Sequence, residues 1–252
     1  MPDAAVVSAP AQDRRAAFAA LKSELSVLAA AGASTALPSL LASGLGDLDA
    51  ALRGGFVRGT IATLEGAAGS GRTAIAARLL ALATRSGLAA VIDDGSLFPP
   101  DLVRAGVRLE RLLVIPARGA SSVARTVDIV LRSRAFGIVL MPAIALRAAV
   151  WSRLAGLTQK AGTLLLALGD RIGNELAALA ATRIECSVET ALMRGARGIF
   201  TRVAGYAVRA CVLKHRRGAP GAIAAIRALE SDDGTPLRER AIARPRLAAV
   251  KG

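Results

Sequence analysis

The stretch Gly66-Ala-Ala-Gly-Ser-Gly-Arg-Thr73 decides the fold of this 252-residue chain. It follows a stretch that predicts a strand over residues 59–66, and it opens a helix predicted near residues 72–85. In a glycine-rich turn between a strand and a helix, backbone N–H groups and the helix N-terminus can hold phosphate. The pattern therefore predicts a phosphate-binding loop, with candidate nucleotide-binding residues Gly66, Gly69, Gly71, Arg72 and Thr73.

One residue of this loop departs from the usual pattern. Arg72 stands where a working loop has Lys, and a planar guanidinium does not take the position of a compact ammonium group. Thr73 keeps the hydroxyl that binds Mg²⁺ in such loops. The alternative interpretation is a glycine-rich turn that binds no ligand.

Strands and helices alternate beyond the loop. Apolar strands are predicted at residues 88–92, 112–115, 137–141 and 163–168, and helices near residues 121–134 and 145–160. Apolar strands that alternate with helices predict an α/β fold with a mostly parallel sheet flanked by helices. Beyond Arg183 the period changes to two, which predicts antiparallel strands at the C-terminal edge, over residues 184–188, 207–214 and 223–230.

The chain divides into one main domain with two terminal additions. Residues 1–36 form a tail and an amphipathic helix, whose apolar residues are Phe18, Leu21, Leu25 and Leu28. This helix could pack on its own domain or on a neighbouring subunit. Residues 37–234 form the core, and residues 235–252 are expected to be a flexible basic tail.

Composition narrows the classes of function. The net charge of +14 favours a polyanionic partner, although an Arg-rich composition alone could produce the same charge. Cys186 and Cys211 lack the spacing of a zinc or redox site, and His215 is the only histidine, so we expect no metal site and no Ser-His-Asp catalysis. No secretory signal or membrane span is expected.

The carboxylate that should complete a magnesium site is missing from its expected place. The strand predicted at residues 137–141 ends in Pro142, where an Asp is needed to hold Mg²⁺. Asp93 and Asp94 follow another strand, and they remain the alternative source of a carboxylate.

The residues quoted so far resemble the RecA family. The resemblance begins at Ser43-Gly-Leu-Gly-Asp-Leu-Asp, continues through the loop to Thr73 and extends more loosely to Leu237. It implies a RecA-like core in which Gly95 replaces a catalytic Glu and Asp170 replaces a Gln that senses the γ-phosphate. Together with Arg72 and Pro142, these departures imply a protein that does not hydrolyse ATP, and we expect neither enzyme activity nor a cofactor.

Among RecA-like proteins, this short, degenerate and Arg-rich form looks most like the ImuA family of bacterial translesion synthesis. That resemblance implies a cytoplasmic adaptor that binds DNA and bridges an ImuB-like inactive Y-family polymerase and an error-prone polymerase. A second copy of the chain and RecA are further partners that the resemblance implies. An active DNA-dependent ATPase and a RecA-like cell-division inhibitor remain the alternatives.

Basic residues next to glycines are the candidate DNA contacts. Aromatic residues make up only 3% of the chain, so binding should depend on phosphate contacts rather than on base stacking. The hairpin that contains Lys214 and Arg216 also resembles the RecA hairpin that reaches a nucleotide across the subunit interface. The alternative for each residue is a solvated surface position or an ion pair with Glu185, Glu189 or Glu230. The candidates are Arg171, Arg194, Arg197, Arg202, Lys214, Arg216 and Arg217.

Overall fold

A computed structural model describes residues 40–194, 202–218, 220–229 and 237–241. The helix predicted within residues 1–36 and the candidate Arg197 lie outside these residues.

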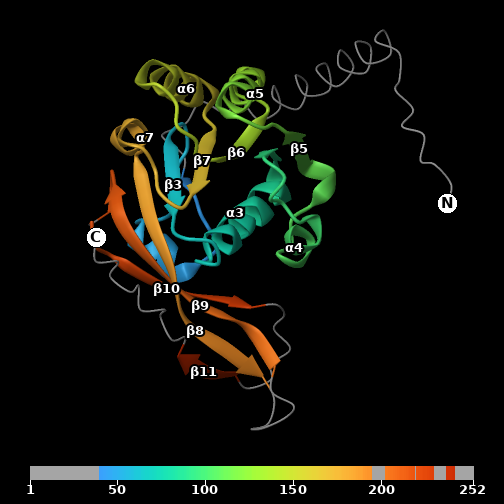
Figure 1. Ribbon diagram of the computed structural model, residues 1–252, viewed down its shortest axis with the longest axis vertical. Coiled ribbons are helices and arrows are strands. Elements are labelled where there is room, and N and C mark those ends of the chain that lie inside the picture. Colours follow the sequence, from blue (N-terminus) through green and yellow to red (C-terminus); the bar gives the residue numbers. More distant parts are fainter. Residues whose placement is uncertain (1–39, 195–201, 219, 230–236, 242–252) are drawn as a thin grey trace, which may run out of the picture.

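The core is a nine-stranded sheet with the order β10-β9-β8-β3-β7-β6-β4-β5, and β11 pairs with β8 (Figure 1). All neighbours from β5 to β8 pair in parallel, whereas β9 joins β8 and β10 joins β9 in antiparallel fashion. The predicted fold class is confirmed. The strands are β3 (Ile61–Glu65), β4 (Leu88–Asp93), β5 (Leu112–Pro116), β6 (Phe136–Pro142), β7 (Leu164–Gly169), β8 (Thr182–Arg194), β9 (Arg202–His215), β10 (Ile223–Leu229) and β11 (Leu237–Ala241).

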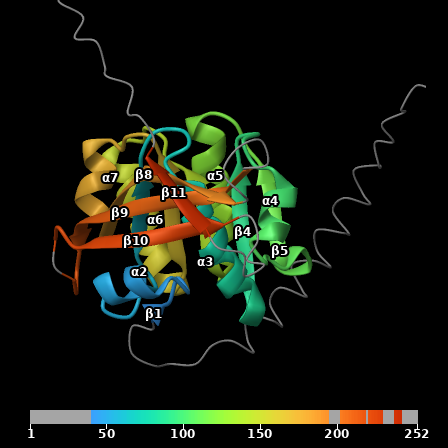
Figure 2. The same cartoon turned by 90° about the horizontal axis from the view of Figure 1, so that it is seen from below.

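Helices cover both faces of the parallel part of the sheet (Figures 1 and 2). Successive residues of β3 point to opposite faces, so Ile61 packs in one apolar cluster and Ala62 in the other. The cluster around Ala62 includes residues of α2 (Gly46–Ala51), α3 (Arg72–Ser86) and α4 (Pro99–Arg104). The cluster around Ile61 includes residues of α5 (Ala120–Ser133), α6 (Ala148–Ala161) and α7 (Asn174–Leu179).

Short elements account for most differences from the sequence-based expectation. The strands β1 (Leu40–Leu41) and β2 (Phe56–Val57) pair with each other, and the helices α4 and α7 have six residues each. Neither helix was predicted, because a six-residue helix is too short to show an apolar period. A 3₁₀ turn at Leu109–Arg111 was missed for the same reason.

Part of the C-terminal segment forms a strand. The tail expected to be flexible over residues 235–252 contains β11, which pairs with Thr190, Ala191, Leu192, Met193 and Arg194 of β8. β9 pairs with one edge of β8 along most of the length of β8, so β3 and β11 share the other edge. On that edge β3 pairs only with residues Thr182 to Glu185 of β8. β11 thus satisfies backbone groups at the distal end of β8, beyond the reach of β3. Figure 1 shows β11 and the adjoining ends of β8 and β9 extending beyond the helical layers.

Within the described residues, no helix is both long enough and apolar enough to cross a membrane.

Candidate functional site

The glycine-rich loop packs tightly against the antiparallel strands. Gly71 caps α3 with a φ of 87°, and a Cβ atom at this position would lie 2.4 Å from Cγ2 of Val208 on β9. A Cβ atom at Gly66 would lie 2.4 Å from the carbonyl oxygen of Cys186 on β8. Both contacts are closer than a side chain allows, so the fold itself requires glycine at these two positions.

The side chain of Arg72 is held by other residues of the chain. Its Nη1 donates hydrogen bonds to the carbonyl of Gly66 and to Oδ1 of Asp170, the latter an ion pair of 2.5 Å. The Gly66 N–H also donates to the carbonyl of Gly169 at the end of β7, 3.1 Å away. The predicted loop residue Arg72 and the predicted sensor position Asp170 are therefore in direct contact.

Two hydroxyl groups of the loop differ in their surroundings. Thr73 is exposed, whereas Ser70 is only 6% exposed and its Oγ has no hydrogen-bond partner among the described residues. The Ser70 Oγ lies 2.7 Å from the position that a Cβ of Gly66 would occupy, so it faces the interior of the loop. An unpaired buried hydroxyl is costly, so this atom is available for a ligand or water.

Cys186 lies beside the loop as a neutral thiol. Burial raises its pKa to about 12, although the nearby Arg72 guanidinium acts in the opposite direction. The thiolate form is thus disfavoured at neutral pH, and the side chain serves as packing.

An ion pair with a buried carboxylate, immediately before the loop, was not predicted from the sequence. Glu65 is 7% exposed, and its two carboxylate oxygens each accept a hydrogen bond of 2.9 Å from the guanidinium of Arg183 on β8. The Thr63 hydroxyl also donates to Oε1 of Glu65, at 2.7 Å. The hydrogen bond from Arg183 to Glu65 raises the pKa of Arg183. Only the pairing of β3 with β8 brings these residues together.

The alternative carboxylates do not reach the loop. Asp93 accepts hydrogen bonds from the N–H groups of Ser96 and Leu97 at 3.1 and 3.0 Å, and Asp94 accepts from Ser96 at 3.2 Å. β6 and β7 also separate β4 from β3 in the sheet. Asp93 and Asp94 therefore stabilise their own turn. The described residues contain no group of three or more His, Cys, Asp or Glu side chains that could hold a metal.

The candidate DNA contacts do not form one cluster. Arg171, Arg202, Arg216 and Arg217 are exposed. Arg194 is buried, with 4% of its surface exposed, and the ammonium group of Lys214 donates to the carbonyls of Ala177 and Ala178 at 3.2 and 2.9 Å.

Position along β9 separates these candidates further. Arg202 and Lys214 stand at opposite ends of this strand, about 40 Å apart at the usual rise of a strand. The described candidates are therefore spread along the length of β9 rather than gathered at one end of it.

Three exposed arginines share the edge of the sheet at which the loop lies. Arg118, Arg147 and Arg171 follow the carboxyl ends of β5, β6 and β7, and we call them the carboxyl-edge arginines. Parallel strands bring their carboxyl ends to one edge, where ligands of open α/β sheets bind. Only Arg171 was predicted as a contact. The loops after β5 and β6 also carry an Arg, two residues after the end of β5 and five residues after the end of β6.

His215 has a structural role. Because the carbonyl of Leu52 can only accept, Nε2 carries the proton and donates to it at 3.1 Å, and Nδ1 accepts from the Thr182 hydroxyl at 2.8 Å. Burial lowers the pKa of this imidazole. The neutral ring joins the end of α2 to β8.

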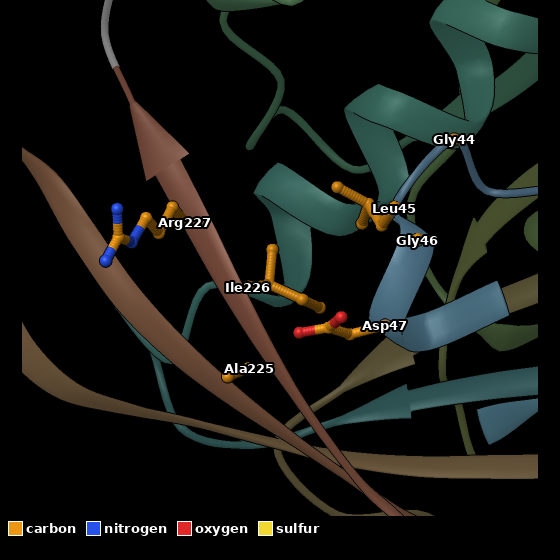
Figure 3. A pocket seen from close by; sticks show the side chains of 7 residues that line it. All are labelled: Gly44, Leu45, Gly46, Asp47, Ala225, Ile226 and Arg227. Carbon is orange, nitrogen blue, oxygen red and sulfur yellow. The ribbon is translucent and has the colours of Figure 1, made fainter. Parts of the chain in front are cut away.

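A cavity of about 270 Å³ lies between the start of α2 and β10 (Figure 3). In Figure 3 the side chains of Asp47 and Ile226 point toward each other, whereas Arg227 points away. No residue of the glycine-rich loop and none of the candidate DNA contacts lines it; its lining is Gly44, Leu45, Gly46, Asp47, Ala225, Ile226 and Arg227.

Comparison with known proteins gives partial matches to one family. No family model matches the chain. It is 34% identical to the RecA protein of Picosynechococcus sp. over 105 residues, which are 41% of this chain and 30% of that protein. It is 34% identical to RecA of Nostoc punctiforme over 107 residues and 35% identical to RecA of Corynebacterium efficiens over 109 residues, and it spans 30% and 28% of their lengths.

The fold is similar to that of a solved recombinase structure. The crystal structure of the RadB recombinase superposes with a TM-score of 0.61 and 17% sequence identity, over 76% of this chain and 97% of that one. The chain is thus RecA-like in fold, and it is related in sequence to RecA over about two-fifths of its length.

Proposed function

We propose that this chain is a non-catalytic RecA-like adaptor that binds DNA in damage-induced mutagenesis and translesion synthesis. The observation that carries the proposal is the ion pair between Arg72 and Asp170, because the cation of the loop is bound by a carboxylate of the same chain. A phosphate group entering the loop would have to displace this carboxylate.

The residues around the loop fit Mg²⁺ poorly. β6 ends in Pro142, which supplies no carboxylate, and Asp93 is engaged with its own turn. Gly95 offers no side chain to activate a water molecule. We therefore derive no hydrolytic step at this site, and these features support a role without ATP turnover.

Charge supports DNA as the partner. The net charge of +14 is accompanied by exposed Arg residues at the carboxyl edge of the sheet and in the turn after β9. Phosphate contacts of this kind give binding that has little sequence preference and weakens steeply as salt rises. Bridging an ImuB-like inactive Y-family polymerase and an error-prone polymerase in the cytoplasm completes the proposed role, with self-association or RecA as further contacts.

The experiment that tests this function measures ATP hydrolysis and DNA binding by the purified chain, with single-stranded and double-stranded DNA. We expect no turnover above background, and DNA affinity that falls linearly with salt on logarithmic axes. DNA-stimulated turnover would instead identify a motor. A salt-independent affinity, or none, would refute the DNA-binding role. Co-purification with each polymerase, tested separately, checks the bridging role.

A further inference from the structure

We propose that Asp170 holds a phosphate-binding site in the glycine-rich loop closed, and that removing its charge opens this site to phosphate anions. The inference rests on the proposed function in treating the loop as non-hydrolysing. It adds a specific means of control at that loop.

The loop keeps donors that suit an anion. α3 has fifteen residues, and the first N–H groups of a helix have no partner within it. Its N-cap, Gly71, provides no capping side chain. The buried Ser70 hydroxyl adds a donor inside the loop that has no partner among the described residues. These groups can satisfy phosphate oxygens without any metal.

Asp170 opposes such an anion in two ways. It occupies Nη1 of Arg72, the cationic group that the loop sequence places next to the helix N-terminus. It also places a negative charge beside the loop, which repels a phosphate group at short range. The same nitrogen of Arg72 donates to the Gly66 carbonyl, so the guanidinium lies across the start of the loop.

The closing contact is able to open. The side chain of Asp170 is 68% exposed, and Arg72 is the partner that the described residues give its carboxylate. The side chain of Arg72 is 20% exposed, but the exposed carboxylate leaves one side of the ion pair open to water and solvent ions, which can replace it. The surrounding backbone is held independently, because Gly66 N–H bonds to the Gly169 carbonyl at 3.1 Å. Asp170 can therefore move away while the loop keeps its shape.

The test measures binding of inorganic pyrophosphate by calorimetry to the whole chain and to Asp170→Asn, at fixed ionic strength. We expect the variant to bind at least about tenfold more tightly, which corresponds to about 1.4 kcal/mol. Asp101→Asn is the matched control, because Asp101 is an exposed carboxylate paired with Arg104 on α4, away from the loop. The double variant Arg72→Ala/Asp170→Asn should lose the gain.

Three results would overturn the proposal. They are equal affinity of the wild-type chain and Asp170→Asn, an equal gain in Asp101→Asn, and a gain that survives Arg72→Ala. Asp170→Gln repeats the test should the Asn variant fold poorly, as thermal unfolding would reveal. A DNA titration of the same samples distinguishes failure of the adaptor role from failure of the Asp170 proposal. If the wild-type chain does not bind DNA, the adaptor role is refuted, and the pyrophosphate result is unaffected.

Discussion

Glu65→Gln should lower the free energy of unfolding more than the loss of any ion pair on the surface does. The substitution keeps the volume of the side chain and removes the charge that accepts both hydrogen bonds from Arg183. Arg183 then keeps its own charge, with a side chain only 26% exposed and without its carboxylate partner. The bond from Thr63 survives, because an amide oxygen also accepts.

The magnitude follows from the burial of the two partners. Removing one partner of a fully buried pair costs about 3–5 kcal/mol, and an exposed pair contributes about 0–1 kcal/mol. Glu65 has a side chain 9% exposed and Arg183 one 26% exposed, so this pair lies between these limits. We expect a loss of about 2–3 kcal/mol, which for a chain of this size lowers Tm by about 4–12 °C.

The assay is urea unfolding followed by circular dichroism, with Arg132→Met as a control. Arg132, with a side chain 58% exposed, pairs with Asp128 on α5, and Asp128 also pairs with Arg153, so removing Arg132 should cost less than about 1 kcal/mol. The double variant Glu65→Gln/Arg183→Met should recover part of the loss, because no unpaired charge remains. A cost for Glu65→Gln no larger than the control's would refute the reasoning.

Three further predictions concern the loop, the histidine and the DNA contacts. Gly71→Ala places a Cβ atom 2.4 Å from Val208 at a φ of 87°, so it should cost about 1–3 kcal/mol in urea unfolding, and Val208→Ala should relieve part of that cost. Burial lowers the pKa of His215, so as the pH falls the unfolded chain binds a proton before the folded chain does. The contribution of the neutral ring to the free energy of unfolding should be complete above about pH 6.5 and be lost as the pH drops through the lowered pKa. In a pH series of urea unfolding, His215→Gln should flatten this part of the curve. Arg171→Ala should reduce the salt slope of DNA binding by about one, whereas Arg132→Ala should leave it unchanged.

The sequence predicted the strands well where burial on both faces makes them continuously apolar. β4 and β7 were placed within one residue at each end, because both faces of these strands are covered by helices. β11 was missed because its polar residues Arg238, Glu239 and Arg240 carry no apolar alternation. Its pairing depends on the free edge that the long β8 provides, which no local pattern shows.

The candidate site was predictable only where its residues are neighbours in sequence. The spacing of Gly66, Gly69 and Gly71 was enough to place the loop, because strand, turn and helix follow one another in the chain. Arg72 and Asp170 are 98 positions apart, and they meet only because β3 and β7 are neighbours in the sheet. The sequence indicated two separate departures from the RecA pattern, and the fold joins them in one ion pair.

This ion pair changes what the retained glycines imply. Gly66 and Gly71 are required by packing against β8 and β9, so they would be needed even in a loop that never binds phosphate. At Gly69 no atom lies within 4 Å of the added Cβ, and only its φ of 78° favours glycine. A glycine pattern alone therefore cannot distinguish an active loop from an inactive one in this fold. Under our proposal Asp170 distinguishes the two, because a carboxylate that binds the cation of the loop competes with the phosphate that an active loop must bind.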